Sequence, residues 1–157
     1  MQIGVDMIYF LIVLGIFLGD LILKNYIEKH KILGKSEDIL AGKIIVTKYH
    51  NQGAFLNLLE KRRELLLLAS GVFVGFMAMF LILIMPHKGK KLLKFGVALM
   101  LGGAASNVYD RVKRGYVVDY FSFSFLKKVV FNISDLFIFL GSIIVACRFA
   151  LQDDLPQ

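Results

Sequence analysis

Four apolar runs dominate the sequence, and each is long enough to cross a lipid bilayer. They cover approximately residues 7–23, 65–85, 92–109 and 129–147 of the 157-residue chain. A helix needs about 20 mostly apolar residues to span roughly 30 Å of hydrocarbon, and it satisfies its own backbone hydrogen bonds there. Hydrophobic residues make up 57% of the chain, and the mean hydropathy is +0.69. We therefore predict an all-α polytopic membrane protein with one membrane-embedded domain over residues 1–157.

The connection between the first two spans carries a different pattern. Residues 43–59, "KIIVTKYHNQGAFLNLL", are rich in β-branched and aromatic residues with a glycine break, which favours short extended segments. Residues 25–33, "NYIEKHKIL", resemble a short interfacial turn or helix. We expect a small β-like or interfacial element here. The first apolar run has no basic residue before it and no small-residue cleavage site after it, so we interpret it as a permanent span.

Polar residues gather where consecutive spans meet at one membrane surface. Spans joined by short connections alternate in direction, so the ends of the first and third spans and the start of the fourth share one face. Three aspartates, two asparagines and one lysine lie at these ends, and a further aspartate lies in the connection between the third and fourth spans: Asp20, Lys24, Asn107, Asp110, Asn132, Asp135 and Asp119. The topology therefore predicts a cluster of acids and carboxamides at one surface.

Some of these acids have a basic residue close by in the sequence. An acid at the centre of a span costs about 2.5 to 3.5 kcal/mol or more, so it needs a partner or a task. Asp20 with Lys24 at i+4 is compatible with an anchoring ion pair or with direct chemistry. Asp110 beside Arg111 favours a buried salt bridge or a helix-terminal contact, and Arg111 could instead bind a lipid phosphate.

Asp119 and Asp135 have no basic neighbour at helical spacing, which makes them the stronger catalytic candidates. Two carboxylates that share a proton can hydrolyse an amide, since one activates water while the other protonates the carbonyl or the leaving amine. The small residues 102–106 before Asn107 permit close approach of a neighbouring helix or of a bound extended peptide.

Other function classes find little support in the sequence. The formal net charge of +7 fits contact with anionic membrane lipids, and we expect no nucleic-acid partner. The single cysteine excludes an intramolecular disulfide, and the three histidines have no metal-ligand spacing. We expect no cofactor and no metal site.

The motifs together resemble the lipoprotein signal peptidase (signal peptidase II) family, four-span aspartyl proteases of the bacterial cytoplasmic membrane. The matching segments, in family order, are "DLILK", "NQGA", "GGAASNVYDR", "GYVVDY" and "FNISD". The resemblance implies a catalytic dyad of Asp119 and Asp135. It further implies substrate contacts at Asn51, Gly53, Gly103, Asn107, Arg111 and Asn132, with Asp20, Lys24 and Asp110 in supporting roles.

The substrate implied by the resemblance is a diacylglyceryl-modified prolipoprotein, cut before its lipidated cysteine. The chain departs from the family pattern at Ser106, Ser134 and Tyr120, where glycine, alanine and phenylalanine are usual, and "NQGAFLNLL" is one residue short. These departures could alter which signal peptides fit or mark a divergent paralogue with narrowed substrates. A lipopeptide-binding paralogue without protease activity is a separate alternative. A small proton- or ion-coupled transporter is a further alternative, although the polar groups collect at one end of the spans and do not cross the membrane.

The family resemblance and the distribution of basic residues disagree about how the chain is oriented in the membrane. The resemblance implies that both termini lie in the cytoplasm and that the active site lies near the extracytoplasmic face. The sequence leaves the oligomeric state open, and we expect a monomer. Lys88, Lys90, Lys91 and Lys94 would then lie inside, as the positive-inside rule favours. Residues 24–63 and 111–128, however, hold nine and five basic residues on the outer side.

Overall fold

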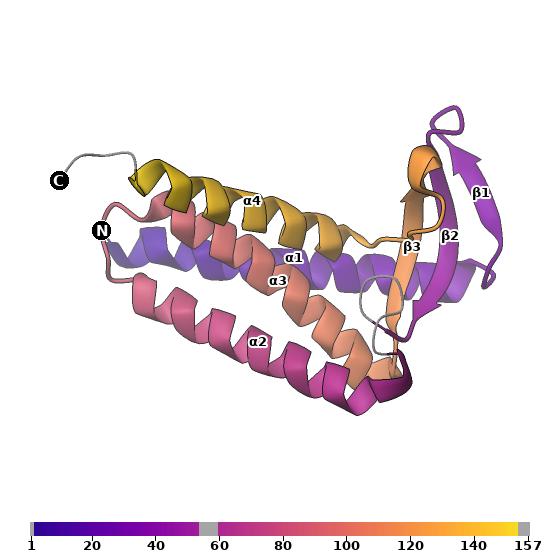
Figure 1. The fold of residues 1–157 in the computed structure, drawn as a ribbon, viewed down its shortest axis with the longest axis horizontal. Coiled ribbons are helices and arrows are strands. Elements are labelled where there is room, and N and C mark those ends of the chain that lie inside the picture. Colours follow the sequence, from indigo (N-terminus) through magenta and orange to yellow (C-terminus); the bar gives the residue numbers. More distant parts are fainter. Residues whose placement is uncertain (1, 54–59, 154–157) are drawn as a thin grey trace.

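The computed structural model describes residues 2–53 and 60–153, which form a bundle of helices with a small sheet at one end (Figure 1). The long helices are α1 (Gln2–His30), α2 (Arg63–Ile84), α3 (Lys91–Arg114) and α4 (Ile133–Asp153). All four are long and apolar enough to cross a membrane. Helix α1 begins and α4 ends at the same end of the bundle, whereas the sheet lies at the opposite end.

Helix α1 is longer than the predicted span over residues 7–23. It contains 29 residues and continues without a break to His30, so it includes most of the segment 25–33 that we expected to form a separate interfacial turn or helix. At about 1.5 Å per residue it is about 43 Å long, longer than the hydrocarbon layer is thick. Residues 25–30 contain neither glycine nor proline, and Ile27 packs against Val118 and Tyr120 of the sheet. The extra turns therefore support the sheet.

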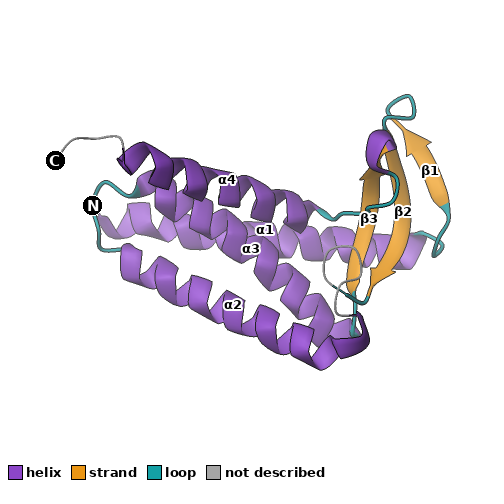
Figure 2. Cartoon of the chain, in the orientation of Figure 1, coloured by secondary structure: helices purple, strands orange, loops and turns teal. Residues whose placement is uncertain are grey.

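The sheet combines two connections that are far apart in the sequence. Strands β1 (Ser36–Ile39) and β2 (Ile44–Asn51) come from the connection between α1 and α2, and β3 (Val117–Phe123) comes from the connection between α3 and α4 (Figure 2). The order is β1-β2-β3, and both pairings are antiparallel. The expected β-like element is confirmed, with a third strand from elsewhere in the chain. Residues 54–59 of "NQGAFLNLL" lie outside the described residues.

Two predicted span boundaries near the sheet are wrong for identifiable reasons. Helix α3 extends past residue 109 to Arg114 and ends at Gly115, whose φ of 79° is left-handed and suits glycine at a helix end. Helix α4 begins at Ile133 instead of Val129, because Phe131 makes backbone hydrogen bonds with Phe121 in both directions, at 2.7 and 3.0 Å.

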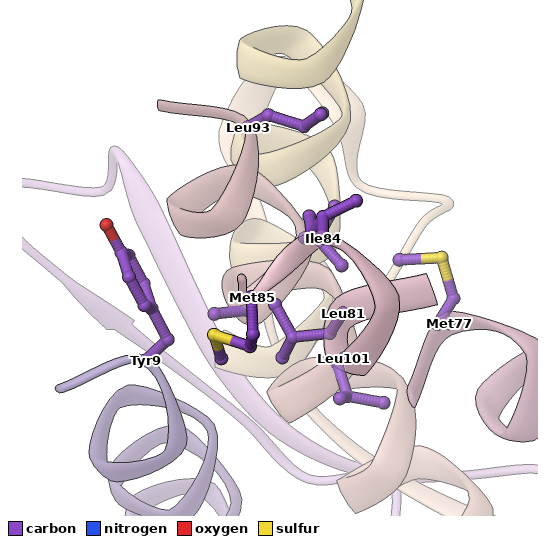
Figure 3. Packing of buried hydrophobic residues seen from close by; sticks show 9 residues of the cluster. Tyr9, Met77, Leu81, Ile84, Met85, Leu93 and Leu101 are labelled. Carbon is purple, nitrogen blue, oxygen red and sulfur yellow. The ribbon is translucent and has the colours of Figure 1, made fainter. Parts of the chain in front are cut away.

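Helix α3 packs closely against α4 through glycines. A Cβ added at Gly103 would lie 2.5 Å from the Ser134 carbonyl oxygen, and one at Gly141 would lie 2.5 Å from the Gly96 carbonyl oxygen. The predicted close approach of a neighbouring helix is therefore confirmed. Tyr9, Leu81 and Leu101 belong to a cluster of buried apolar residues from α1, α2 and α3, shown from close by in Figure 3. Near the end far from the sheet, the buried Lys94 lies 2.9 Å from Asp6 Oδ1 and donates to the Met85 carbonyl oxygen.

Candidate active site

Lys24 of α1 lies at the centre of the polar cluster, and its side chain has 0% exposed surface. Its ammonium group lies 2.8 Å from Asp20 Oδ2 and 3.3 Å from Asp110 Oδ2. It also donates hydrogen bonds to Ser106 Oγ at 3.1 Å and to Asn107 Oδ1 at 2.8 Å. A buried charge is tolerated only when it is paired and hydrogen-bonded, and these four contacts meet that condition. The predicted Asp20–Lys24 ion pair is confirmed.

Asp110 connects the end of α3 to the start of β3. Its carboxylate lies 2.9 Å from Arg114 Nε, one helical turn later, and its Oδ2 accepts a hydrogen bond from the backbone N–H of Val118 at 3.1 Å. The buried salt bridge and the helix-terminal contact expected at Asp110 are both present. The basic partners are Lys24 and Arg114 and not the adjacent Arg111, because at i+4 Arg114 lies over the same helix face and i+1 does not. Asp110 is fully buried and is not one of the cavity-lining residues.

Asp119 on β3 receives two hydrogen bonds from asparagine side chains. Asn51 Nδ2 donates to its Oδ2 at 2.9 Å, and Asn132 Nδ2 donates to its Oδ1 at 2.7 Å. The carbonyl oxygen of Asn51 accepts the backbone N–H of Gly53 at 3.0 Å. That contact fixes which end of the Asn51 amide faces the aspartate, because a backbone N–H can only donate.

The carboxylate of Asp135 also accepts a hydrogen bond from an asparagine side chain, in this case from α3. Asn107 Nδ2 donates to Asp135 Oδ1 at 2.9 Å, while Asn107 Oδ1 faces the Lys24 ammonium. Since an ammonium group has no acceptor, Lys24 requires the amide oxygen on its side and so directs the Asn107 NH₂ group to Asp135. Asn132 Nδ2 also donates to Asn107 Oδ1 at 3.1 Å and links the two aspartates through their amide partners.

Asp135 also belongs to the first turn of α4. Its Oδ2 accepts the backbone N–H of Asn132, and Asn132 Oδ1 accepts the backbone N–H of Asp135, both at 3.0 Å. This reciprocal pair has the geometry of a capping box, which satisfies donors that a helix start leaves free. The helix start therefore holds the Asp135 carboxylate in one orientation.

The environment of Asp119 favours its protonated form. Burial and the neighbouring Asp135 together raise the pKa of this carboxyl to about 7, although the hydrogen bonds from Asn51 and Asn132 act to lower it. Two carboxyl groups that interact in this way titrate together, so each proton that is lost belongs to the pair and not to one residue. At near-neutral pH the pair therefore holds a proton that an isolated aspartate would have lost.

A cavity of about 860 Å³ contains both aspartates. Its polar wall is formed by Asn51, Asn107, Arg111, Asp119 and Asp135, and much of the remainder is aromatic or aliphatic, including Phe123, Phe125, Leu126, Leu136 and Phe139. Apolar pockets with a few convergent polar groups are typical ligand sites. Each carboxylate can thus meet a ligand in a mainly apolar space.

The remaining predicted site residues fall into two groups. Arg111 lines the cavity and donates to the Gly53 carbonyl oxygen at 3.2 Å, which places Gly53 beside the site. Among the described residues, Arg111 Nε is buried and has no hydrogen-bond partner. Gly103 lies against the backbone of α4, and Asn132 lies between the two aspartates; neither is among the residues that line the cavity.

Sequence reasoning missed the aromatic part of the cavity wall. Residues 121–125 read "FSFSF", and this alternation places Phe121, Phe123 and Phe125 at every second position along β3 and the turn after it. A period of two in a strand predicts a shared face. That signal could have identified Phe123 and Phe125 as wall residues.

Comparison with known proteins gives a consistent match over nearly the whole chain. The family model described as "Signal peptidase (SPase) II" matches residues 12–151. A lipoprotein signal peptidase of Lactiplantibacillus plantarum is 32% identical over 147 residues, which cover 94% of this chain and 96% of the relative. One from Caldicellulosiruptor bescii is 30% identical over 139 residues, 88% of each chain.

The fold has a match among solved structures as well. A bacterial membrane enzyme solved at 2.3 Å by the in meso method superposes with a TM-score of 0.80 and 21% identity, covering 93% of this chain and 89% of that one. At this identity the likeness concerns the fold, four helices with a small sheet.

We predict that Lys24→Met lowers the free energy of unfolding by about 3 to 5 kcal/mol, because the substitution leaves the buried carboxylates of Asp20 and Asp110 without their shared cation. The control is Lys31→Met, which removes an exposed pair with Glu37 at 2.7 Å and should leave the free energy of unfolding almost unchanged, because solvent screens such a pair. Both values can be measured by denaturant titration in detergent micelles. Equal losses in the two variants would contradict the assigned role of Lys24.

Proposed function

Since the chain belongs to the signal peptidase II family of aspartic-type peptidases, we propose that Asp119 and Asp135 are the two aspartates that perform its reaction. One observation carries the proposal. Each carboxylate receives an amide N–H from an asparagine whose other end is fixed by a separate contact, and both carboxylates line one cavity. Other buried aspartates, Asp20 and Asp110, are paired with Lys24 and are not cavity-lining residues.

The proposed mechanism uses the shared proton of the pair. One carboxylate takes a proton from a water molecule as the water oxygen bonds to the scissile carbonyl carbon. The other carboxyl gives its own proton, the second of the two, to the carbonyl oxygen, which produces a tetrahedral diol. As the C–N bond breaks, the first carboxyl passes the water-derived proton to the leaving amine, and a hydroxyl of the diol returns a proton to the second carboxylate. The raised pKa of Asp119, about 7, keeps this second proton available near neutral pH.

The cavity wall supports the positioning of an extended peptide. Asn51, Asn107 and Arg111 provide N–H donors on the wall that contains the two aspartates, and Arg111 Nε is a buried donor. In this proposal Arg111 donates to a carbonyl of the bound signal peptide. Asn132 and Gly103 contribute indirectly, through the orientation of the carboxylates and the close packing of α3 on α4.

The apolar wall supports a lipidated substrate. Phe123, Phe125, Leu126 and Phe139 line the same cavity as the aspartates, and an apolar wall binds acyl chains through the hydrophobic effect. We therefore propose that the substrates are diacylglyceryl-modified prolipoproteins and that cleavage occurs before the lipidated cysteine, with surrounding membrane lipids contacting the outer faces of the bundle.

The site lies at the sheet end of the bundle, which we propose faces the extracytoplasmic side, with both termini in the cytoplasm. Signal peptides are removed from exported proteins, so the aspartates belong near the outer surface. Lys88 in the short α2–α3 connection and Lys91 at the start of α3 are exposed at the opposite end, as the positive-inside rule favours. Lys24 at the sheet end and Lys94 at the opposite end are both buried and paired with acids, so neither is available to lipid head groups.

We predict that Asp119→Asn and Asp135→Asn each reduce cleavage of a purified lipidated prolipoprotein by about a thousandfold or more, because neither half of a proton-sharing pair works alone. Both variants should stay folded and bind the substrate, and chelators should leave wild-type activity unchanged. Asp38→Asn, on the exposed strand β1, is the matched control and should cleave normally. Substantial cleavage by either folded dyad variant would exclude this pair.

The pH dependence of kcat/KM tests the contact between Asn51 and Asp119. The wild type should lose activity as pH rises through about 7, where Asp119 releases its proton. The Asn51 hydrogen bond favours the charged form of Asp119 and lowers the pKa of Asp119. Asn51→Ala should therefore raise this pKa and move the loss of activity at high pH, the basic limb of the profile, to a higher pH. Asn25→Ala, whose side chain contacts Arg114 at the surface, is the control. An unmoved limb in Asn51→Ala would contradict the contact.

Cysteine labelling tests which end of the bundle faces the outside of the cell. Both test variants carry Cys147→Ser, which removes the native thiol. The Asp38→Cys variant should react with a membrane-impermeant maleimide in intact cells. The Lys88→Cys variant should react only after the membrane is opened. Both positions are exposed, at opposite ends of the bundle. The reverse labelling pattern would place the two aspartates on the cytoplasmic side and contradict the proposed function.

A further inference from the structure

Three hydroxyl groups from three different elements converge on the carboxylate of Asp20. Ser106 Oγ from α3 donates to Asp20 Oδ2 at 2.6 Å, and Ser134 Oγ from α4 donates to the same oxygen at 2.5 Å. Tyr120 OH from β3 donates to Asp20 Oδ1 at 3.0 Å. Helix α1 is thereby connected to every element that carries a side chain of the proposed active site, apart from β2.

The hydroxyl of Tyr120 makes a second contact that bears on the dyad. It accepts the backbone N–H of Ile133, the first residue of α4, at 3.0 Å. Tyr120 directly follows Asp119 on β3, and Ile133 precedes Asp135 by two residues on α4. One hydroxyl therefore joins the strand that carries Asp119 to the helix that carries Asp135. Burial and the Asp20 carboxylate raise the pKa of Tyr120 above its ordinary value, so its proton stays in place near neutral pH.

The two serines act from the other side of Asp20. Ser106 Oγ accepts from Lys24 while it donates to Asp20, so this hydroxyl lies between the two charges. Lys24 in turn donates to Asn107 Oδ1 at 2.8 Å, and this contact directs the Asn107 amide N–H toward Asp135. A displacement of Asp20 would release Lys24 and, with it, the orientation of the Asn107 amide.

We propose that the hydroxyls of Tyr120, Ser106 and Ser134 are positioning groups for the reaction, acting through Asp20 and Lys24 on the two catalytic carboxylates. The inference rests on the proposed dyad of Asp119 and Asp135. None of the three hydroxyls touches the substrate in this account. Their task is to hold the strand, the helix start and the Asn107 amide at the separation at which the carboxylates share one proton.

The test measures kcat and KM separately for Tyr120→Phe, Ser106→Ala and Ser134→Ala. Each substitution removes a hydroxyl oxygen and adds no atom. We expect kcat of Tyr120→Phe to fall by about tenfold to a hundredfold with KM nearly unchanged, because small misplacements of reacting groups cost rate more than binding. The controls are Tyr109→Phe and Ser70→Ala, at a ring packed on Phe17 and at a hydroxyl bonded to its own helix; both should keep wild-type kcat.

A double-mutant cycle provides a second readout. Tyr120→Phe and Ser134→Ala act on the same carboxylate, so their combined loss in kcat should be smaller than the product of the single losses. Tyr120→Phe combined with Ser70→Ala should instead be multiplicative. All rates are measured per folded molecule, below the melting temperature of each variant.

The outcomes separate the inference from the proposed function. If Tyr120→Phe lowers the melting temperature but keeps wild-type kcat, or if the cycle with Ser134→Ala is multiplicative, the hydroxyls are only structural and the inference is overturned. In that event the loss of cleavage in Asp119→Asn and Asp135→Asn would leave the dyad in place. Cleavage by either of those folded variants would overturn the dyad itself.

Discussion

The ammonium group of Lys24 imposes the constraint on which the polar end of the bundle depends. A lysine with no exposed surface in a membrane helix requires acceptors on every side, since an unpaired buried charge costs several kcal/mol. Asp20, Ser106, Asn107 and Asp110 supply those acceptors from two helices. Because α1 and α3 must approach closely to satisfy this one group, the positions of Asn107 and of the start of β3, which Asp110 holds, follow from it.

Asparagine side chains of fixed orientation connect this polar core to the carboxylates of Asp119 and Asp135. Asn51, Asn107 and Asn132 each have a carbonyl oxygen held by a donor, which fixes the side toward which each NH₂ group points. Two of them donate to Asp119 and one to Asp135. A preorganised polar environment of this kind does not have to rearrange during the reaction, which is how buried sites stabilise developing charge.

Much of this arrangement could be predicted from the sequence, since apolar runs identify spans and their alternation places the acids at one surface. The placement of Asp119 in the connection between the third and fourth spans, on the same surface as Asp135, was predicted from the same alternation. The contacts of Asp110 with Lys24 and with the backbone of Val118 could not be predicted, because they depend on how α1 and β3 pack against the end of α3. The joint contact of Ser106, Tyr120 and Ser134 with Asp20 was hidden as well, since only tertiary packing brings together residues up to 114 positions apart.

The central claim is that Asp119 and Asp135 share one proton near neutral pH, and infrared difference spectroscopy of the purified protein tests it most directly. The account predicts a protonated carboxyl band that disappears as the pH rises through about 7 and that is absent from the titration of both Asp119→Asn and Asp135→Asn. A wild-type spectrum without a protonated carboxyl at mildly acidic pH, or a band that titrates unchanged in both variants, would contradict it.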